Sequence, residues 1–149
     1  MRAVVQRVTE ARVVVEERTV GEIGAGLLVL LGIAVEDDAG AAEWMADKLL
    51  NLRMFSDHED KMNHSVIDAN GEVLLVSQFT LYGDARKGRR PSFIRAARGS
   101  EARTLYELVL SEIEAAGVPT ASGEFGAMMQ VELTNDGPIT ILLDSERGF

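Results

Sequence analysis

The chain of 149 residues lacks several residue types on which common active sites are built. It has no cysteine, which excludes disulfides, thiolate nucleophiles and cysteine-ligated zinc, and which fits a reducing compartment. The only two histidines, His58 and His64, lie in one polar stretch without a hydroxyl motif beside them, so a Ser/His/Asp triad has little support. Asp57, Asp60 and Asn63 lack the spacing of a calcium loop. We therefore predict neither a metal site nor a cofactor.

Long hydrophobic runs are also missing. The longest apolar stretch, residues 27–35, is too short to span a bilayer. Residues 1–8 carry a charge inside their apolar run and no small-residue cleavage site, so they predict a first strand rather than a signal peptide. Apolar residues make up 46% of the chain and charged residues 26%, and the length fits one domain over residues 1–149. We expect a cytoplasmic protein without a membrane partner.

Positive charge is scarce and unevenly distributed. The formal net charge of −9 argues against a general nucleic-acid binder, and no DNA partner is expected. Residues 85–103 nevertheless contain seven basic side chains and one acid, a local charge of +6, which leaves −15 for the rest. Such a segment is either a phosphate-binding patch or a solvated arginine-rich loop, and composition favours neither. Its first four basic residues are Arg86, Lys87, Arg89 and Arg90.

Hydrophobic periodicity predicts an α/β domain with layered mixed β-sheets and two main helices. The helices are expected at residues 38–52, with Asp38 as N-cap, and at residues 100–116, with Ser100 as N-cap. The first two strands are expected to form a hairpin, and the third to be buried on both faces because it lacks polar alternation. Strands are expected at residues 4–8, 12–16, 27–35, 53–55, 72–81, 127–133 and 139–143.

A first polar motif begins where the apolar run of the strand at 72–81 ends. Ser77 and Thr80 carry hydroxyls, Gln78 carries an amide, and the backbone N–H groups of Phe79 and Thr80 can point at a bound carbonyl. The same residues also fit an ordinary strand in which Thr80 packs on the pleated surface. A threonine nucleophile needs a base within reach, and the sequence offers none there. Chemistry at this motif therefore depends on backbone groups and positioning.

A second motif, Asn135-Asp136-Gly137-Pro138, contains the residues that turns prefer. We expect it to join two strands as a hairpin turn, with Pro138 beginning the second strand, where a missing N–H is tolerated. A cis bond before proline is uncommon, at about 5–6% of such bonds. If this bond is cis, the carbonyls of Gly137 and Pro138 face the same way, and two parallel acceptors can grip a small ammonium group.

Together the two motifs resemble those of the D-aminoacyl-tRNA deacylase family, also called the D-tyrosyl-tRNA deacylase family. The similarity runs nearly from end to end, and both motifs occur in the family's order within its usual length. The chain departs at Ile139, where valine is usual, and at Arg98-Gly99, which replaces a commoner proline-containing stretch. The matching segments are residues 1–8, 26–32, 61–63, 76–83, 90–93, 125–127 and 135–140.

The resemblance implies a homodimer that hydrolyses the ester between a D-amino acid and the 3′ end of tRNA. It implies that Gly137-Pro138 is cis and enters the other subunit's active site, where it rejects L-amino acids by steric clash and lets glycine pass. Arg7 matches the position that holds this motif in place. The catalytic and oxyanion-binding segment matches Ser77, Gln78, Phe79 and Thr80, and pocket-lining positions match Phe125 and Met129.

Three functions are consistent with the sequence. The first is the deacylase: its activated ester needs no strong protein nucleophile, and each backbone donor contributes roughly 3–4 kcal/mol to oxyanion stabilisation. Its predicted tRNA-binding residues are Arg86, Lys87, Arg89 and Arg90. The second is a non-catalytic tRNA-binding module built on residues 86–103, which the aromatic content of 5% disfavours. The third is a hydrolase of another ester or amide with Thr80 as nucleophile, for which we find no base.

Overall fold

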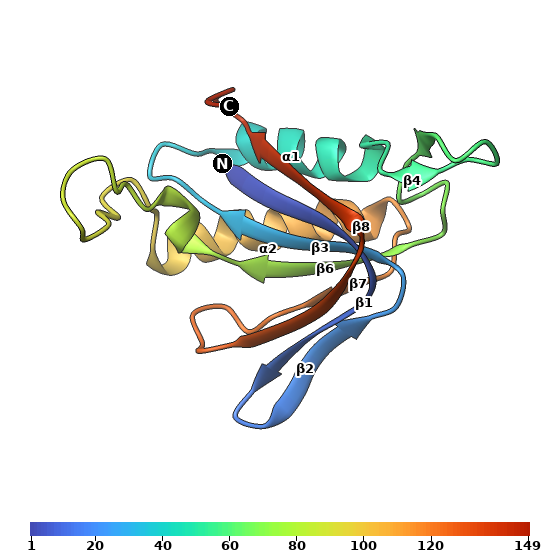
Figure 1. The fold of residues 1–149 in the computed structure, drawn as a ribbon. Helices are drawn as coiled ribbons and strands as arrows, with labels where there is room; N and C mark the ends of the chain where they lie inside the picture. Colours follow the sequence, from blue (N-terminus) through green and yellow to red (C-terminus); the bar gives the residue numbers. More distant parts are fainter.

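The computed structural model describes residues 1–149 as one six-stranded mixed sheet with two helices packed against it (Figure 1). The strand order is β2-β1-β3-β6-β7, and β8 also pairs with β1. The expected α/β class with two main helices is confirmed. The sheet consists of β1 (Arg2–Val15), β2 (Arg18–Ile23), β3 (Gly26–Gly32), β6 (Glu72–Ser77), β7 (Thr120–Ser122) and β8 (Gln130–Asp144). The other elements are α1 (Ala39–Asn51), β4 (Phe55–Ser56), β5 (Met62–His64), the 3-10 turn η1 (Phe79–Tyr82) and α2 (Gly99–Ala115).

The centre of the sheet explains why two apolar runs lack polar alternation. β3 and β6 lie side by side in parallel, and β3 is also paired with β1 on its other edge. On one face, Leu27 and Val73 belong to the large core that includes both helices. On the other face, Leu28 and Leu74 pack into a smaller core under the curled β1–β2 hairpin. Because both faces are covered, apolar side chains occupy both, as is usual for parallel strands.

The first hairpin lies later in the chain than the sequence predicts. β1 is continuous over both segments that were expected to be separate strands, and the polar residues 9–10 are exposed positions within it. The chain reverses instead at Glu16 and Glu17, whose φ angles are +48° and +65°. Two successive positive φ angles give a turn whose twist matches that of the strands it joins. The expected strand at 12–16 is therefore the second half of β1, and its partner β2 was not predicted.

Both expected helices are present, but their caps differ. Asp38 caps α1 by accepting a hydrogen bond from the N–H of Ala41 at 2.9 Å, as predicted. α2 begins at Gly99, one residue earlier than predicted. The N-cap position is Arg98, whose side chain makes no capping hydrogen bond. Gly99 has a φ of +68°, a conformation that glycine adopts readily. Ser100 lies inside the helix, so its prediction as N-cap was wrong. No helix is long and apolar enough to cross a membrane.

The largest departure from the sequence prediction lies in β8. Instead of two strands joined by a hairpin turn, both halves of β8 run in the same direction along β1. Val8 pairs with Asn135 and Gln6 with Thr140, so Arg7 alone lies opposite the four residues 136–139. These residues therefore loop out of one continuous strand, as in an enlarged β-bulge. The peptide bond between Gly137 and Pro138, within this loop, is cis.

The segments after α1 and β6 also depart from the prediction. The strand expected at 72–81 ends at Ser77, after which the N–H of Gln78 donates to the carbonyl of Leu31 at 2.7 Å and the chain turns into η1. The short hairpin of β4 and β5 begins at the end of the strand expected at 53–55 and continues through the polar stretch that follows it. β7 was not predicted, because three residues carry too weak a pattern.

Candidate active site

A pocket of about 430 Å³ opens where β3 and β6 end. Its walls come from these strand ends, from η1, from the first turn of α2 and from the segment between β7 and β8. Sites commonly form at the carboxyl ends of parallel strands, where the chain is free to turn away in loops. The apolar wall includes Leu31, Ile33, Val76, Ala102, Phe125 and Met129, and the polar groups are those of Ser77, Gln78 and Arg98.

Two neighbouring backbone N–H groups, that of the pocket-lining Phe79 and that of the next residue, have no backbone acceptor. The first N–H groups of a helical turn have no partner within the turn itself. In η1 these groups belong to Phe79 and Thr80, and neither donates to another backbone carbonyl. Neighbouring N–H groups held rigidly by a turn are suited to stabilise an oxygen that gains negative charge. The end of β6 therefore carries two N–H groups without a backbone acceptor at the residues predicted to bind the oxyanion, and that role stays a prediction.

The hydroxyl of Thr80 is not activated in this arrangement. Gln78 Nε2 donates a hydrogen bond to Thr80 Oγ1, and no carboxylate or histidine is bonded to that oxygen. Thr80 is exposed and does not line the pocket, whereas Ser77 and Gln78 are half-buried on its wall. The geometry thus favours positioning by backbone groups over attack by this side chain.

Two aromatic rings frame the pocket, and each is covered by an arginine from the start of α2. The guanidinium of Arg98 lies 5.4 Å from the ring centroid of Phe79, and that of Arg103 lies 5.4 Å from the ring centroid of Phe125. Both distances suit a cation–π contact. Phe125 also contacts Tyr106, at 5.5 Å between centroids. These contacts tie the pocket rim to α2.

The structure brings together only part of the predicted site. Ser77, Gln78, Phe79, Phe125 and Met129 line one pocket, and Met129 also packs against the smaller core. Arg7, Gly137 and Pro138 lie elsewhere: Arg7 pairs with Leu27, which pairs with Val73, four residues before Ser77 on β6. Four residues of a strand correspond to about 13 Å. The loop at 136–139 does not line the pocket of its own chain.

Hydrogen bonds of Arg7 and Asn135 hold the loop at 136–139 in place. Arg7 donates from Nε to the carbonyl of Asp136 at 2.9 Å and from Nη1 to the carbonyl of Met54 at 2.8 Å. Asn135 donates to the carbonyl of Ile139 at 3.0 Å and accepts from the N–H of Ile139 at 2.7 Å, as a paired strand would. The loop therefore keeps its shape although it is exposed. The role of Asn135 was not predicted, since asparagine at the start of a turn motif has a simpler explanation.

The basic residues predicted to bind tRNA lie on a projecting loop before α2, the yellow-green loop at the left of Figure 1. Two backbone hydrogen bonds between Asp84 and Ser92, at 2.8 and 2.9 Å, close this loop. Within it Arg86 is engaged by Asp84, and the hydrogen bonds from Arg86 hold the pKa of Asp84 well below its ordinary value. The exposed basic residues without an acidic partner are Lys87, Arg89 and Arg90.

Sequence comparison identifies close relatives of the whole chain. The family model described as D-Tyr-tRNA(Tyr) deacylase matches residues 4–144. The D-aminoacyl-tRNA deacylase of Clostridioides difficile is 56% identical over 149 residues, which cover 100% of both chains. The D-aminoacyl-tRNA deacylase of Thermotoga petrophila is 55% identical with the same coverage.

Solved structures share the fold. A protein named c-Myc DNA Unwinding Element Binding Protein superposes with a TM-score of 0.92 at 44% identity, covering 97% of this chain and 99% of its own. A probable eukaryotic D-amino acid tRNA deacylase superposes with a TM-score of 0.83, covering 95% and 97%, at 18% identity. The second likeness concerns the fold alone, and it shows that this sheet and its two helices persist when most side chains differ.

Proposed function

Since this chain belongs to the D-Tyr-tRNA(Tyr) deacylase family, we propose that it hydrolyses the ester that joins a D-amino acid to the 3′ end of tRNA. The observation that carries the proposal is the pocket at the end of β6, with two free backbone donors, in a chain that matches deacylases over its full length. The enzyme is thus a carboxylic ester hydrolase that needs neither a serine triad nor an activated threonine.

The chemistry follows from the donors. Water adds to the ester carbonyl, with the neighbouring ribose 2′-hydroxyl or a second water taking its proton, and the carbonyl oxygen becomes negative and is held by the N–H groups of Phe79 and Thr80. The bond from the carbonyl carbon to the ribose 3′-oxygen then breaks, and a proton passes to that oxygen. The products are free tRNA and the D-amino acid. Each donor of this kind contributes about 3–4 kcal/mol to the transition state, and the ester is already activated.

We further propose that the protein works as a homodimer in which the loop at 136–139 of one subunit enters the pocket of the other. The loop is exposed, fastened by Arg7 and remote from its own pocket. Gly137 has φ +151°, and an added Cβ would lie 2.7 Å from the N atom of Ile139, so this position requires glycine. A bare backbone wall rejects L-amino acids by clash, whereas D-amino acids and glycine fit.

The loop closed by Asp84 and Ser92 supplies the contact with RNA in this proposal. Its unpaired cations Lys87, Arg89 and Arg90 bind phosphates, and Arg86 contributes less because Asp84 already neutralises it. Such contacts read the backbone and not the base, so they tolerate many tRNAs. The cytoplasm, where aminoacyl-tRNA is used, is the compartment that fits this substrate.

A single-turnover assay tests the activity. D-tyrosyl-tRNA, L-tyrosyl-tRNA and glycyl-tRNA are incubated with enzyme in excess, and the loss of ester is followed against a sample without enzyme. We expect rapid loss of the D-tyrosyl and glycyl esters and no acceleration for the L-tyrosyl ester. Ala127→Trp, which fills the pocket, is the matched inactive variant. If tRNA binds but no ester is lost, the protein is the non-catalytic tRNA-binding module instead.

A further inference from the structure

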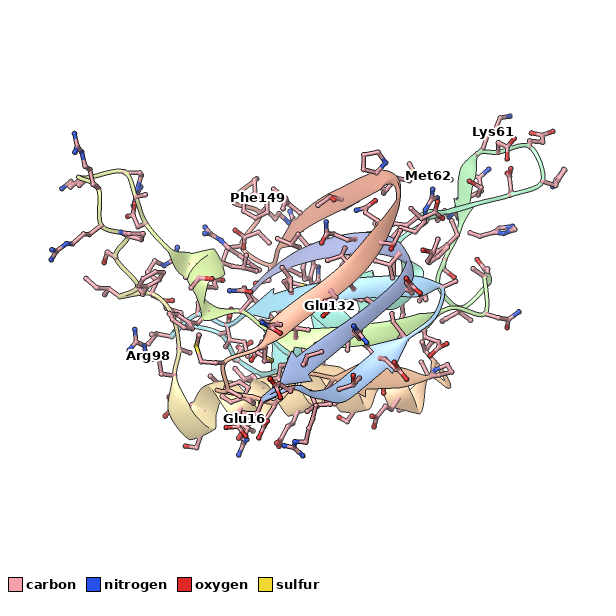
Figure 2. The ribbon with its side chains drawn as sticks, turned by 60° about the horizontal axis from the view of Figure 1, so that its bottom comes forward. Glu16, Lys61, Met62, Arg98, Glu132 and Phe149 are labelled. Carbon is pink, nitrogen blue, oxygen red and sulfur yellow. The ribbon has the colours of Figure 1, made fainter.

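Arg98 is a pocket-lining cation that no other residue of the chain neutralises. It lies on the pocket wall, is exposed, and has no carboxylate within 4.0 Å. Figure 2 shows Arg98 beside the basic loop, at the end of the molecule opposite Lys61 and Met62. A bare guanidinium at the mouth of an apolar pocket favours an anionic ligand.

Three other arginines of residues 85–103 differ from Arg98 in this respect, because each has an acidic partner. Arg95 is bound by Glu146 at 2.7 Å, and Arg86 is bound by Asp84. Arg103 covers Phe125 with the same geometry as Arg98 covers Phe79, yet it lies 3.9 Å from Glu107 and is not part of the pocket wall. Arg98 therefore combines free charge with direct access to the pocket.

The contact with Phe79 also gives Arg98 a defined position. Phe79 is 46% exposed, and its ring is held edge-to-face by Phe93, with centroids 5.3 Å apart. The guanidinium of Arg98 rests on this ring, and the backbone N–H of the same phenylalanine is one of the two free donors. The anion that Arg98 binds is thereby placed at a fixed offset from the oxyanion donors.

We propose that Arg98 binds the 5′-phosphate of the terminal nucleotide of the aminoacyl-RNA and so positions the ester against the N–H groups of Phe79 and Thr80. This inference rests on the proposed function. The terminal nucleotide is the part of the substrate that must enter the pocket with the ester, and its phosphate is the negative charge nearest to the reacting carbon. The planar guanidinium matches phosphate oxygens in a two-pronged geometry. Arg98 is a positioning residue, because it acts on the substrate away from the reacting atoms.

Two small substrates that differ in one phosphate test this role. The first is 2′(3′)-O-(D-tyrosyl)adenosine 5′-monophosphate, and the second is the same ester with a free 5′-hydroxyl. We expect Arg98→Ala to raise KM for the phosphorylated ester about tenfold, as expected when one hydrogen bond to a charged group is lost. For the ester without phosphate, we expect the KM of Arg98→Ala to equal that of the unmodified protein. Arg98→Lys keeps the charge and should recover most of the loss.

Arg103→Ala is the matched control, since it removes an arginine that also covers a pocket aromatic ring but carries an acidic partner. Any change in KM should be the same for both esters, because Arg103 can act on them only through Phe125. An equal loss on both esters in Arg98→Ala would show that the residue only supports Phe79, and no loss on either would show that it binds nothing; each result overturns the inference. If the unmodified protein hydrolyses neither small ester but cleaves D-tyrosyl-tRNA, the inference also fails while the proposed function stands. Failure on all D-esters would overturn the proposed function itself.

Discussion

The polar groups at the two ends of the central strands differ in whether they have partners within the chain. At the pocket end, the N–H groups of Phe79 and Thr80 have no backbone partner, and Arg98 has no acid beside it. At the other end, the side chain of Arg7 makes two hydrogen bonds and that of Asn135 makes three to the chain around the loop at 136–139. Donors without a partner beside an apolar cavity can bind a ligand. Donors that already have partners around an exposed loop fix the conformation of that loop.

The contrast supports the proposed homodimer, in which one chain alone lacks a complete site. The pocket end has an apolar wall and free donors, but no feature there distinguishes a D-amino acid from an L-amino acid. The loop at 136–139 presents a rigid backbone at Gly137, but it lies about 13 Å along the strands from the pocket of its own chain. We therefore expect each end to act with the opposite end of a second copy.

Mixed dimers give the largest effect. Gly137→Val forces a side chain against Ile139 and should inactivate the loop, and Ala127→Trp should inactivate the pocket. Each variant alone is expected to lose hydrolysis of D-tyrosyl-tRNA. Co-expressed with different affinity tags and purified as the mixed dimer, the two should regain one intact site per dimer and about half of the kcat of the unmodified dimer.

The control for this experiment is a chain that carries both substitutions. Mixed with unmodified chain, it leaves no site with two intact ends, so that dimer should be inactive. Activity in this control, or none in the complementary dimer, would mean that loop and pocket act within one subunit. Light scattering on each preparation verifies that dimers are compared with dimers.

Loosening the loop should have the next largest effect. Arg7→Ala removes two hydrogen bonds from a charged donor to the carbonyls of Asp136 and Met54. Bonds of this kind contribute about 1.5–3 kcal/mol each, so the loss of both leads us to expect kcat/KM for D-tyrosyl-tRNA to fall by about 100-fold or more. We also expect the protection of L-tyrosyl-tRNA to weaken, because a mobile wall rejects less strictly.

Arg7→Lys serves as the matched variant, since it keeps the charge but reaches only one of the two carbonyls. Its kcat/KM should lie between the other two values. A fall of equal size that follows the melting temperature, and that leaves the L-ester untouched, would make Arg7 a general stabilising residue.

Binding of tRNA should respond more modestly to the basic loop. Replacing Arg89 and Arg90 with alanine removes two unpaired cations, and each lost phosphate contact flattens the salt dependence of log K by roughly 0.7–0.9. We expect the slope to fall by about 1.5. Arg86→Gln should change it less, because Asp84 already engages that guanidinium. Titrations of uncharged tRNA at several salt concentrations measure the slope.

Arg18→Ala with Lys48→Ala is the control pair, since it removes two positive charges from elements that lie outside the basic loop. An unchanged slope in the Arg89/Arg90 variant would remove this loop from the tRNA interface. An equal change in both pairs would mean that only the net charge matters.

Local sequence signals were reliable for elements with a strong pattern. The α1 helix begins after Asp38 as predicted, and β3 and β6 are buried as their unbroken apolar runs indicated. Prediction failed where pairing decides the structure. A looped-out segment and a hairpin turn use the same Asn-Asp-Gly-Pro residues, and only the register of both halves of β8 against β1 separates them.

The site residues also differ in how well the sequence alone could predict them. The residues at 77–79, Phe125 and Met129 could be placed in one pocket by resemblance, and they do share it. The proposed role of Arg98 depends on the lack of an acidic side chain near its guanidinium. The sequence alone does not show which side chains are neighbours in space. Its position before Gly99, where the chain departs from the family pattern, was the available signal.

The smallest effect is expected for Thr80→Ala. Its hydroxyl is exposed, lies outside the pocket wall and accepts a hydrogen bond from Gln78 without a base beside it, so we expect kcat for single-turnover hydrolysis to fall by less than about tenfold. The contrasting change is Phe79→Pro, which deletes one N–H at the first position of η1, where proline is tolerated. Compared with Phe79→Ala, which loses the ring but keeps the N–H, it should lose about 100- to 1,000-fold in kcat. If folded Thr80→Ala is instead inactive and Thr80→Ser is not, the hydroxyl is the nucleophile and the backbone donors are secondary.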